Sequence, residues 1–271
     1  MKKKEYENLY LSPDNEGDAL VRLAEIIKVL RKECPWDSVQ THDTLTKCML
    51  EEAYEAVEAI QNKDTENLRE ELGDVLLQVV FHCNLSEEEN AFNLTEVINE
   101  ECEKMIRRHP HIFLEEQVKT IDKALEKWEN VKSSEHGEVR YTERLERVPK
   151  ALPALLRSSK VQSKASKIGF DWDDASGAFD KLEEEIKELR CAYENSDTQN
   201  MSEEFGDLLF SMVNVSRFLN IDPEETLNDA TAKFIRRFAS MEQMAVERNL
   251  DFAELSLEEM DKLWVEAKNK K

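Results

Sequence analysis

The chain has 271 residues, long enough for about two domains of ordinary size. Its 59 Asp and Glu residues outnumber its 37 Lys and Arg residues, giving a formal net charge of −22 at pH 7. Duplex nucleic acid and anionic membrane surfaces repel so acidic a chain, so neither is expected as a partner. With 6 Gly and 6 Pro residues, the composition favours long helices over turn-rich β structure.

The five cysteines form no CxxC pair, which is typical of reduced thiols in a cytosolic protein. The basic start MKKKEYENLY is not followed by the apolar run of a signal peptide. The most apolar stretch, Val75 to Phe81, is too short to span a bilayer. We therefore expect a cytoplasmic protein with no membrane partner.

Apolar residues recur at helical spacing along most of the chain, and neither half shows the alternation of a β-strand. The dipeptide Asp222-Pro223 predicts a helix start, with Asp222 as N-cap and Pro223 at the first helical position. The sequence thus predicts an all-α fold with a helical bundle in each half. The expected helices cover 20–30, 45–60, 68–85, 97–106, 152–161, 179–193, 205–219 and 226–244.

Two groups of four carboxylates share one spacing. They are Glu52, Glu55, Glu71 and Asp74 in the first half, and Glu185, Glu188, Glu204 and Asp207 in the second. In each group, two acids three residues apart are followed sixteen residues later by two more, also three apart. This spacing puts the acids of a pair on one helix face, where like charges repel unless a cation lies between them. The pattern predicts two metal sites.

Carboxylate oxygens suit hard cations, so Mg²⁺ is the expected metal and Mn²⁺ the second choice. A di-iron bundle would use histidine ligands, which both groups lack. Gly73 and Gly206 lie between the two acids of each second pair, although a mid-helix glycine costs about 1 kcal/mol relative to alanine. They indicate either a close approach by another helix or a ligand, or inherited close helix packing.

Further landmarks follow the same order in both halves, which indicates an internal duplication. The dipeptide Trp-Asp precedes each acidic group at Trp36 and Trp172, and a late tryptophan follows it at Trp128 and Trp264. The polar segment 133–150 is the expected linker. The predicted domains are therefore an N-terminal domain over 1–132 and a C-terminal domain over 151–271.

Each half also has a lysine and an arginine four residues apart on one helix face: Lys104 and Arg108, and Lys233 and Arg237. In so acidic a chain these pairs are candidate phosphate contacts, and internal salt bridges are the alternative. Trp128 and Trp264 could stack on a nucleobase, although a tryptophan more often anchors a core. The predicted helices 68–85 and 205–219 are apolar on more than one side, so the halves are expected to pair within or between chains.

The segments CPWDSVQTHDTL, LEEAYE, EELGDVLLQVVFH and RRHPHIF resemble the first half of the MazG family, and KIGFDW, EEFGDLLFSMVN and IDPEETLNDATAKFIRRF resemble its second half. The resemblance covers nearly the whole chain. It implies an all-α nucleoside triphosphate pyrophosphohydrolase, commonly a homodimer. Such an enzyme uses Mg²⁺ to hydrolyse nucleoside triphosphates, ATP among them, to nucleoside monophosphate and pyrophosphate.

The resemblance also implies roles for individual residues. Glu185, Glu188, Glu204 and Asp207 would be the catalytic metal ligands, and Lys181, Glu185, Lys233, Arg237 and Trp264 would contact the nucleotide. Lys104, Arg108 and Trp128 would form a candidate N-terminal counterpart. Lys181 is replaced by Cys48 in the first half, which agrees with turnover mainly in the C-terminal domain. The alternative is a nucleotide-binding regulator with slow or no turnover.

Overall fold

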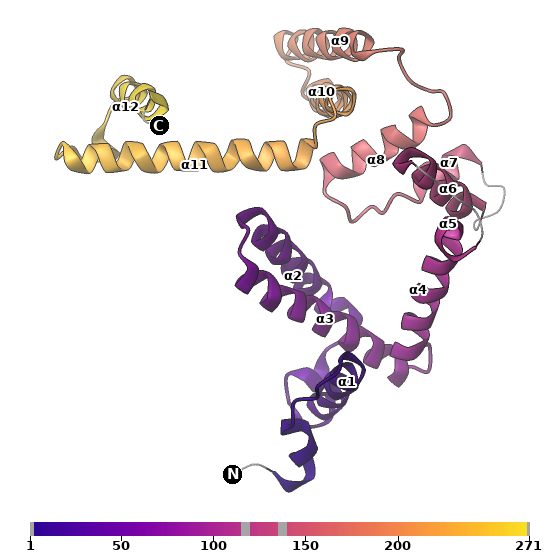
Figure 1. The fold of residues 1–271 in the computed structure, drawn as a ribbon. Coiled ribbons are helices and arrows are strands. Elements are labelled where there is room, and N and C mark those ends of the chain that lie inside the picture. Colours follow the sequence, from indigo (N-terminus) through magenta and orange to yellow (C-terminus); the bar gives the residue numbers. More distant parts are fainter. Residues whose placement is uncertain (1–2, 115–119, 135–139, 270–271) are drawn as a thin grey trace. The chain divides into compact units, whose positions relative to one another are not determined.

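The computed structural model describes residues 3–114, 120–134 and 140–269. The chain divides into two compact units, Met1–Gly137 and Glu138–Lys271. Over the described ranges the secondary structure is helical and contains no strand, which confirms the predicted all-α class (Figure 1). No helix in these ranges has the length and apolar character needed to cross a membrane.

The helices of the first unit are η1 (Lys4–Tyr10), α1 (Glu16–Glu33), η2 (Asp37–Val39), α2 (His42–Asn62), α3 (Thr65–Glu88), α4 (Leu94–Arg108), α5 (Pro110–Phe113) and α6 (Ile121–Ser134). Those of the second are α7 (Tyr141–Glu146), α8 (Ala154–Ser166), α9 (Ala175–Glu194), α10 (Thr198–Phe218), α11 (Pro223–Glu247), η3 (Phe252–Glu254) and α12 (Leu257–Asn269).

Every predicted helix overlaps an observed one, although the observed helices extend up to seven residues beyond the predicted ends, as α10 does at its start. Helices α5, α6, α7 and α12 lie outside the predicted ranges. The predicted start of α11 is confirmed: the Asp222 carboxylate accepts hydrogen bonds from the backbone N–H groups of Glu224 and Glu225, at 2.9 and 3.0 Å. Helix α7 falls inside the segment proposed as a linker, and the side chain of Val148 in that segment is buried.

A helical hairpin forms the main element of each unit: α2 with α3, and α9 with α10 (Figure 1). Both hairpins turn through a residue with a left-handed backbone, Lys63 with φ 57° and Ser196 with φ 56°. An aspartate follows at once as the N-cap of the second helix, Asp64 for α3 and Asp197 for α10. The two halves therefore share the same tight turn as well as the same acidic spacing.

Two apolar clusters lie at different places in the two units. In the first unit, Ile27, Leu45, Val80, Phe81 and Leu85 join α1, α2 and α3. In the second, Met241, Met244, Ala245, Leu263 and Ala267 join α11 to α12. These contacts leave other large apolar side chains of the hairpins exposed, among them Leu72 and Leu76 on α3 and Phe205 and Leu209 on α10.

A pair of stacked histidines joins α2 to α3 in the first unit. The Nδ1 atoms of His42 and His82 lie 2.7 Å apart, so one ring must donate and the other accept. The rings stack with centroids 5.0 Å apart, and the His42 Nε2 atom lies 3.3 Å from the Ser86 hydroxyl. Burial, and then the nearby charge of His42, lower the pKa of His82 from its ordinary value of 6.5.

Acid is expected to destabilise the first unit through this pair. The fold favours neutral His82, so below pH 6.5 the unfolded chain binds a proton that the folded chain resists. Stability is therefore full above that pH and falls as the pH drops through it. His82→Val, which reproduces Val215 at the matching position of α10, should remove this part of the pH dependence.

Thermal unfolding followed by circular dichroism at about pH 7.5 and about pH 5.5 measures the effect. Carboxylates elsewhere contribute equally to both proteins, so the difference between wild type and variant isolates the histidine. Equal losses of melting temperature in the two proteins would contradict the prediction.

Candidate active site

The hairpin turns bring the predicted carboxylates together. Each turn lies almost midway between the second acid of the first helix and the first acid of the next, so these acids face each other across the hairpin. In the first unit, one oxygen from each of Glu52, Glu55 and Glu71 lies within 4.8 Å of the others. In the second unit the same holds for Glu185, Glu188 and Glu204. Three of the four predicted ligands thus converge in each unit.

We call these groups the N-terminal cluster (Glu52, Glu55, Glu71) and the C-terminal cluster (Glu185, Glu188, Glu204). Asp74 and Asp207, the fourth predicted ligands, stay outside the 4.8 Å groups. Their charges still act on the clusters, since Asp74 contributes to the raised pKa of Glu71 and Asp207 to that of Glu204. Each aspartate therefore lies beside its cluster.

The N-terminal cluster is held in an electrostatically unfavourable state. Glu71 is buried, and burial, followed by repulsion from Glu55 and Glu52, raises the pKa of its carboxyl group. Burial, followed by repulsion from Asp74 and Glu55, likewise raises the pKa of Glu52. Among the described residues, no lysine or arginine forms an ion pair with these three glutamates.

The C-terminal cluster contains an internal cation. Glu185 is the most buried of its acids, with 3% of its surface exposed. The Lys181 ammonium lies one turn earlier on α9, 2.7 Å from a Glu185 oxygen and 2.7 Å from a Glu184 oxygen. Hydrogen bonds to Glu184 and then Glu185 raise the pKa of Lys181. Burial, and then repulsion from Glu188, raise the pKa of Glu204.

Both clusters suit a hard divalent cation. Each offers three carboxylate oxygens from two adjacent helices, with a fourth acid beside them, and Mg²⁺ and Mn²⁺ prefer such oxygen ligands. Buried carboxylates that repel one another gain most from a cation placed between them. The donor set, with one buried glutamate in each cluster, thus fits the predicted divalent metal.

Gly73 and Gly206 do not reflect a close contact among the described residues of their own units. A Cβ atom added at either position would meet no described atom within 4 Å. Both glycines lie on open helix surface beside the acids of α3 and α10. The predicted close approach therefore does not come from the glycine's own unit.

The predicted arginine and the predicted late tryptophan lie together in each unit. In the second unit, the Arg237 guanidinium and the Lys268 ammonium each lie 5.8 Å from the centroid of the Trp264 indole. In the first unit, Arg108 and Lys132 lie 5.4 and 4.6 Å from the Trp128 centroid. In both units the tryptophan therefore lies near two cationic side chains. The sequence predicted the arginine in each case but not the lysine.

Other contacts of the predicted basic and aromatic residues differ between the units. Lys104 forms an ion pair with Glu101, the internal salt bridge weighed as the alternative. Lys233 is exposed on α11, a helix that packs mainly on α12 and α8. Trp264 is half-buried and packs on the α11–α12 core, so it also serves as a core anchor. In the described chain, the ion pair at the C-terminal cluster comes from Lys181 rather than from α11.

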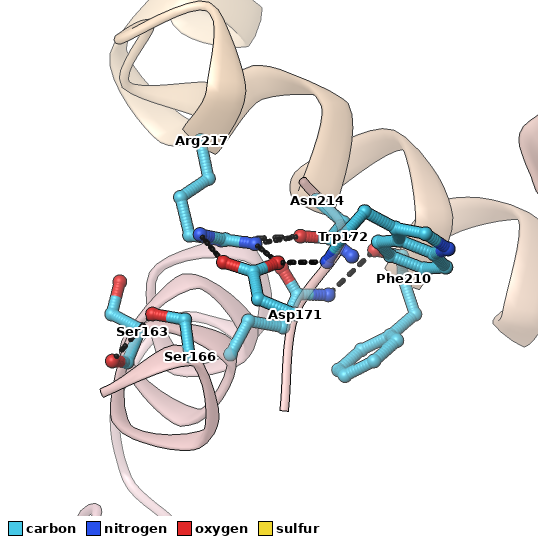
Figure 2. A network of polar contacts seen from close by, with 8 residues as sticks. Ser163, Ser166, Asp171, Trp172, Phe210, Asn214 and Arg217 are labelled. Atoms are coloured by element: carbon cyan, nitrogen blue, oxygen red, sulfur yellow. Dashed lines mark hydrogen bonds and ion pairs between the residues drawn. The ribbon is translucent and has the colours of Figure 1, made fainter. Parts of the chain in front are cut away.

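A polar network fixes the loop before α9 (Figure 2). The Arg217 guanidinium of α10 donates two hydrogen bonds to the Asp171 carboxylate, at 2.8 and 2.5 Å, and also donates to the Asn214 side chain. The Trp172 backbone N–H donates to Asp171 at 3.0 Å. Arg217 lowers the pKa of Asp171 through these contacts. The network thus ties this loop to the helix that carries Glu204.

The Trp172 indole lies against the first turn of α9 at Gly177. A Cβ atom at that glycine would fall 2.2 Å from the indole Cδ1 atom, so a larger residue there would displace the ring. In the first unit a different arginine holds the corresponding loop. Arg31 of α1 donates to the carbonyl oxygens of Asp37 and Gln40, at 2.5 and 3.0 Å, and pairs with Glu88.

Sequence reasoning missed Arg31, Arg217 and the two histidines. Their partners lie 40 or more residues away, or are backbone carbonyls, so no local spacing points to them. The Lys181–Glu185 ion pair is different. Its spacing of four residues on one helix is a local signal that could have predicted the contact.

Comparison with known proteins links this geometry to one family. The profile of the MazG nucleotide pyrophosphohydrolase domain matches residues 40–113 and 177–241, one match in each unit. The chain is 43% identical over 254 residues to "Nucleoside triphosphate pyrophosphohydrolase/pyrophosphatase MazG" of Thermotoga maritima, covering 93% of this chain and 96% of that protein. It is 36% identical over 256 residues to the nucleoside triphosphate pyrophosphohydrolase of Escherichia coli K12, covering 94% and 97%.

A solved structure, that of a mazG-related protein from Thermotoga maritima, aligns with 42% of this chain and 99% of its own. The TM-score is 0.38 and the sequence identity 30%. The two profile matches include the acidic groups of both units, and they confirm the tandem repeat predicted from the spacing.

Proposed function

Because the chain belongs to the MazG nucleotide pyrophosphohydrolase family, we propose that it hydrolyses nucleoside triphosphates to nucleoside monophosphate and pyrophosphate with Mg²⁺. One observation carries the proposal: in each unit, three helix-borne glutamates converge within 4.8 Å, with an aspartate beside them. The pyrophosphohydrolase reaction class is that of the family. The choice of Mg²⁺, with Mn²⁺ as substitute, rests on the all-carboxylate donor set.

In the proposed reaction, Glu185, Glu188, Glu204 and Asp207 would hold the cation. When bound, the cation neutralises phosphate charge and lowers the pKa of a coordinated water. A carboxylate of the cluster orients the attacking water and accepts its proton. The water oxygen forms a bond to the α-phosphorus, and the bond from that phosphorus to the bridging oxygen breaks. Lys181, Lys233 and Arg237 offset charge on the departing pyrophosphate.

We place turnover mainly in the C-terminal unit. Lys181 puts an ammonium at the C-terminal cluster, where it can meet a phosphate, and Cys48 occupies that place in the first unit. Lys47, the neighbouring residue, pairs with Glu51 on another side of α2. The N-terminal unit has its own cluster and its own tryptophan between cations, and we propose it as a second nucleotide-binding site.

We further propose a cytoplasmic homodimer whose ligands are nucleotides rather than nucleic acid or membrane. The exposed apolar side chains on α3 and α10 support a dimer, because burying them against a second copy removes them from water. Gly73 and Gly206 lie on these same helices and leave room for a close approach. Sedimentation equilibrium of the full chain tests this assembly.

Product analysis tests the proposed reaction. A mixture of nucleoside triphosphates is incubated with the protein and Mg²⁺, and the products are separated by anion exchange. We expect monophosphate and pyrophosphate in equal amounts, and no turnover after chelation of the metal. Diphosphate with inorganic phosphate would mean attack at the γ-phosphorus and would overturn the mechanism. Tight nucleotide binding without any product would favour the regulator instead.

A further inference from the structure

Lys181 already neutralises part of the C-terminal cluster. Its ammonium lies 2.7 Å from an oxygen of Glu185, whose side chain is 4% exposed. A metal that takes that oxygen as a ligand must compete with the ammonium for it. Lys181 itself is 37% exposed and also pairs with Glu184, so it can move without being left in an apolar interior.

Among the residues that the structure describes, the N-terminal cluster has no such competitor. Cys48 stands at the position of Lys181, and its side chain packs against the core of the first unit. Lys47 is one residue earlier, which rotates it about 100° around the helix. Its ammonium lies 3.1 Å from Glu51, which is not part of the cluster, and its side chain is 83% exposed. The lysine of the first unit thus stands one position earlier than its counterpart in the second unit. For this reason, within the described chain, the C-terminal cluster has a lysine partner and the N-terminal cluster does not.

We propose that Lys181 is an exchangeable internal cation that makes metal binding at the C-terminal cluster depend on the nucleotide. Without nucleotide, a divalent cation must displace the ammonium from Glu185. With nucleotide present, the phosphate oxygens receive the displaced ammonium, so metal and triphosphate bind cooperatively. The N-terminal cluster takes up the cation without this requirement. The inference rests on the proposed function and adds an order of binding to it.

The size of the effect follows from the strength of such ion pairs. Because the Lys181 ammonium is partly exposed and keeps Glu184 as a second partner, moving it off Glu185 should cost little more than breaking a surface salt bridge. Displacing it should therefore weaken metal binding by about three- to tenfold. By reciprocity, the nucleotide should strengthen metal binding at this cluster, and the metal should strengthen nucleotide binding, by the same factor. In this proposal Lys181 responds to both ligands, because the cation displaces it from Glu185 and the phosphate then receives it.

The test measures Mn²⁺ binding to the full chain by the electron paramagnetic resonance signal of free Mn²⁺. The doubles Glu52→Gln/Glu55→Gln and Glu185→Gln/Glu188→Gln assign each class of sites to its cluster. Without nucleotide, Lys181→Met should bind Mn²⁺ about three- to tenfold more tightly at the C-terminal cluster. Lys187→Met makes the same charge change on another face of α9 and should leave the affinity unchanged.

A non-hydrolysable triphosphate with a methylene group between its α- and β-phosphorus completes the experiment. It should tighten Mn²⁺ binding at the C-terminal cluster of wild type more than in Lys181→Met. Unchanged or weaker Mn²⁺ binding in Lys181→Met without nucleotide would overturn the inference, as would the absence of Mn²⁺ at the wild-type clusters. Pyrophosphate release by wild type, measured in parallel, decides the proposed function separately. If wild type releases pyrophosphate and Lys181→Met binds Mn²⁺ with unchanged affinity, the proposed displacement of Lys181 is wrong and the proposed enzymatic function is retained.

Discussion

Converting Glu185 and Glu188 together to glutamine is expected to lower the rate of pyrophosphate release on the order of a thousandfold or more. Glutamine keeps the size of each side chain but removes the negative charge that holds the cation. Glu185 is buried, so water cannot take the place of its carboxylate. The measurement is the initial rate of pyrophosphate formation at saturating Mg²⁺ and nucleoside triphosphate.

The matched control is Glu52→Gln/Glu55→Gln, the same chemical change at the N-terminal cluster. If the C-terminal unit carries out the hydrolysis, this variant should keep most of the wild-type rate of pyrophosphate release. Circular dichroism and melting temperatures establish that both doubles are folded. Loss of release in the control alone would move the active site to the first unit. Equal partial losses would show that both units turn over.

The helices and the duplication were predictable because both depend on local spacing. Apolar periodicity marked eight helices, and Asp222-Pro223 marked the start of α11. The carboxylates were predictable as a group because a two-helix hairpin with a short turn can place them in only one register. The hairpin brings three glutamates of each group together and leaves Asp74 and Asp207 beside them.

The short helix inside the segment proposed as a linker was harder to predict. The segment 133–150 is charged and polar, yet it contains α7 and the buried Val148. A single apolar residue among charges carries little signal in a sequence, and its burial depends on packing against another element. A short helix of this kind becomes visible only when its partner, α8, is in place.

Contacts between residues far apart in the sequence could also not be predicted. Asp171 and Arg217 are 46 residues apart, and His42 and His82 are 40 apart. Their meeting depends on how α8 packs on α10 and how α2 packs on α3. The sequence identifies residues that can make such bonds, but many acids and arginines compete for each role in a chain with 35% charged residues.

Arg237→Ala is expected to lower kcat/KM for nucleoside triphosphates by about a hundredfold. Arg237 lies over the Trp264 indole, which orients the guanidinium and reduces the freedom it loses on binding phosphate. Arg237→Lys keeps the charge but loses the planar two-point contact, so it should recover only part of the activity. Steady-state kinetics over a range of triphosphate concentrations give the ratio.

Arg236→Ala is the matched control, because Arg236 is the exposed neighbour on the same helix and points about 100° away. It should leave kcat/KM within about twofold of wild type, as surface charges away from a site usually do. Equal losses in Arg236→Ala and Arg237→Ala would mean that α11 contributes only general positive charge. A loss confined to Arg237→Ala would mean that α11 reaches the triphosphate at one defined position. Because α11 packs mainly on α12 and α8 within the chain, that result would also require α11 to meet the carboxylates on binding or in the dimer.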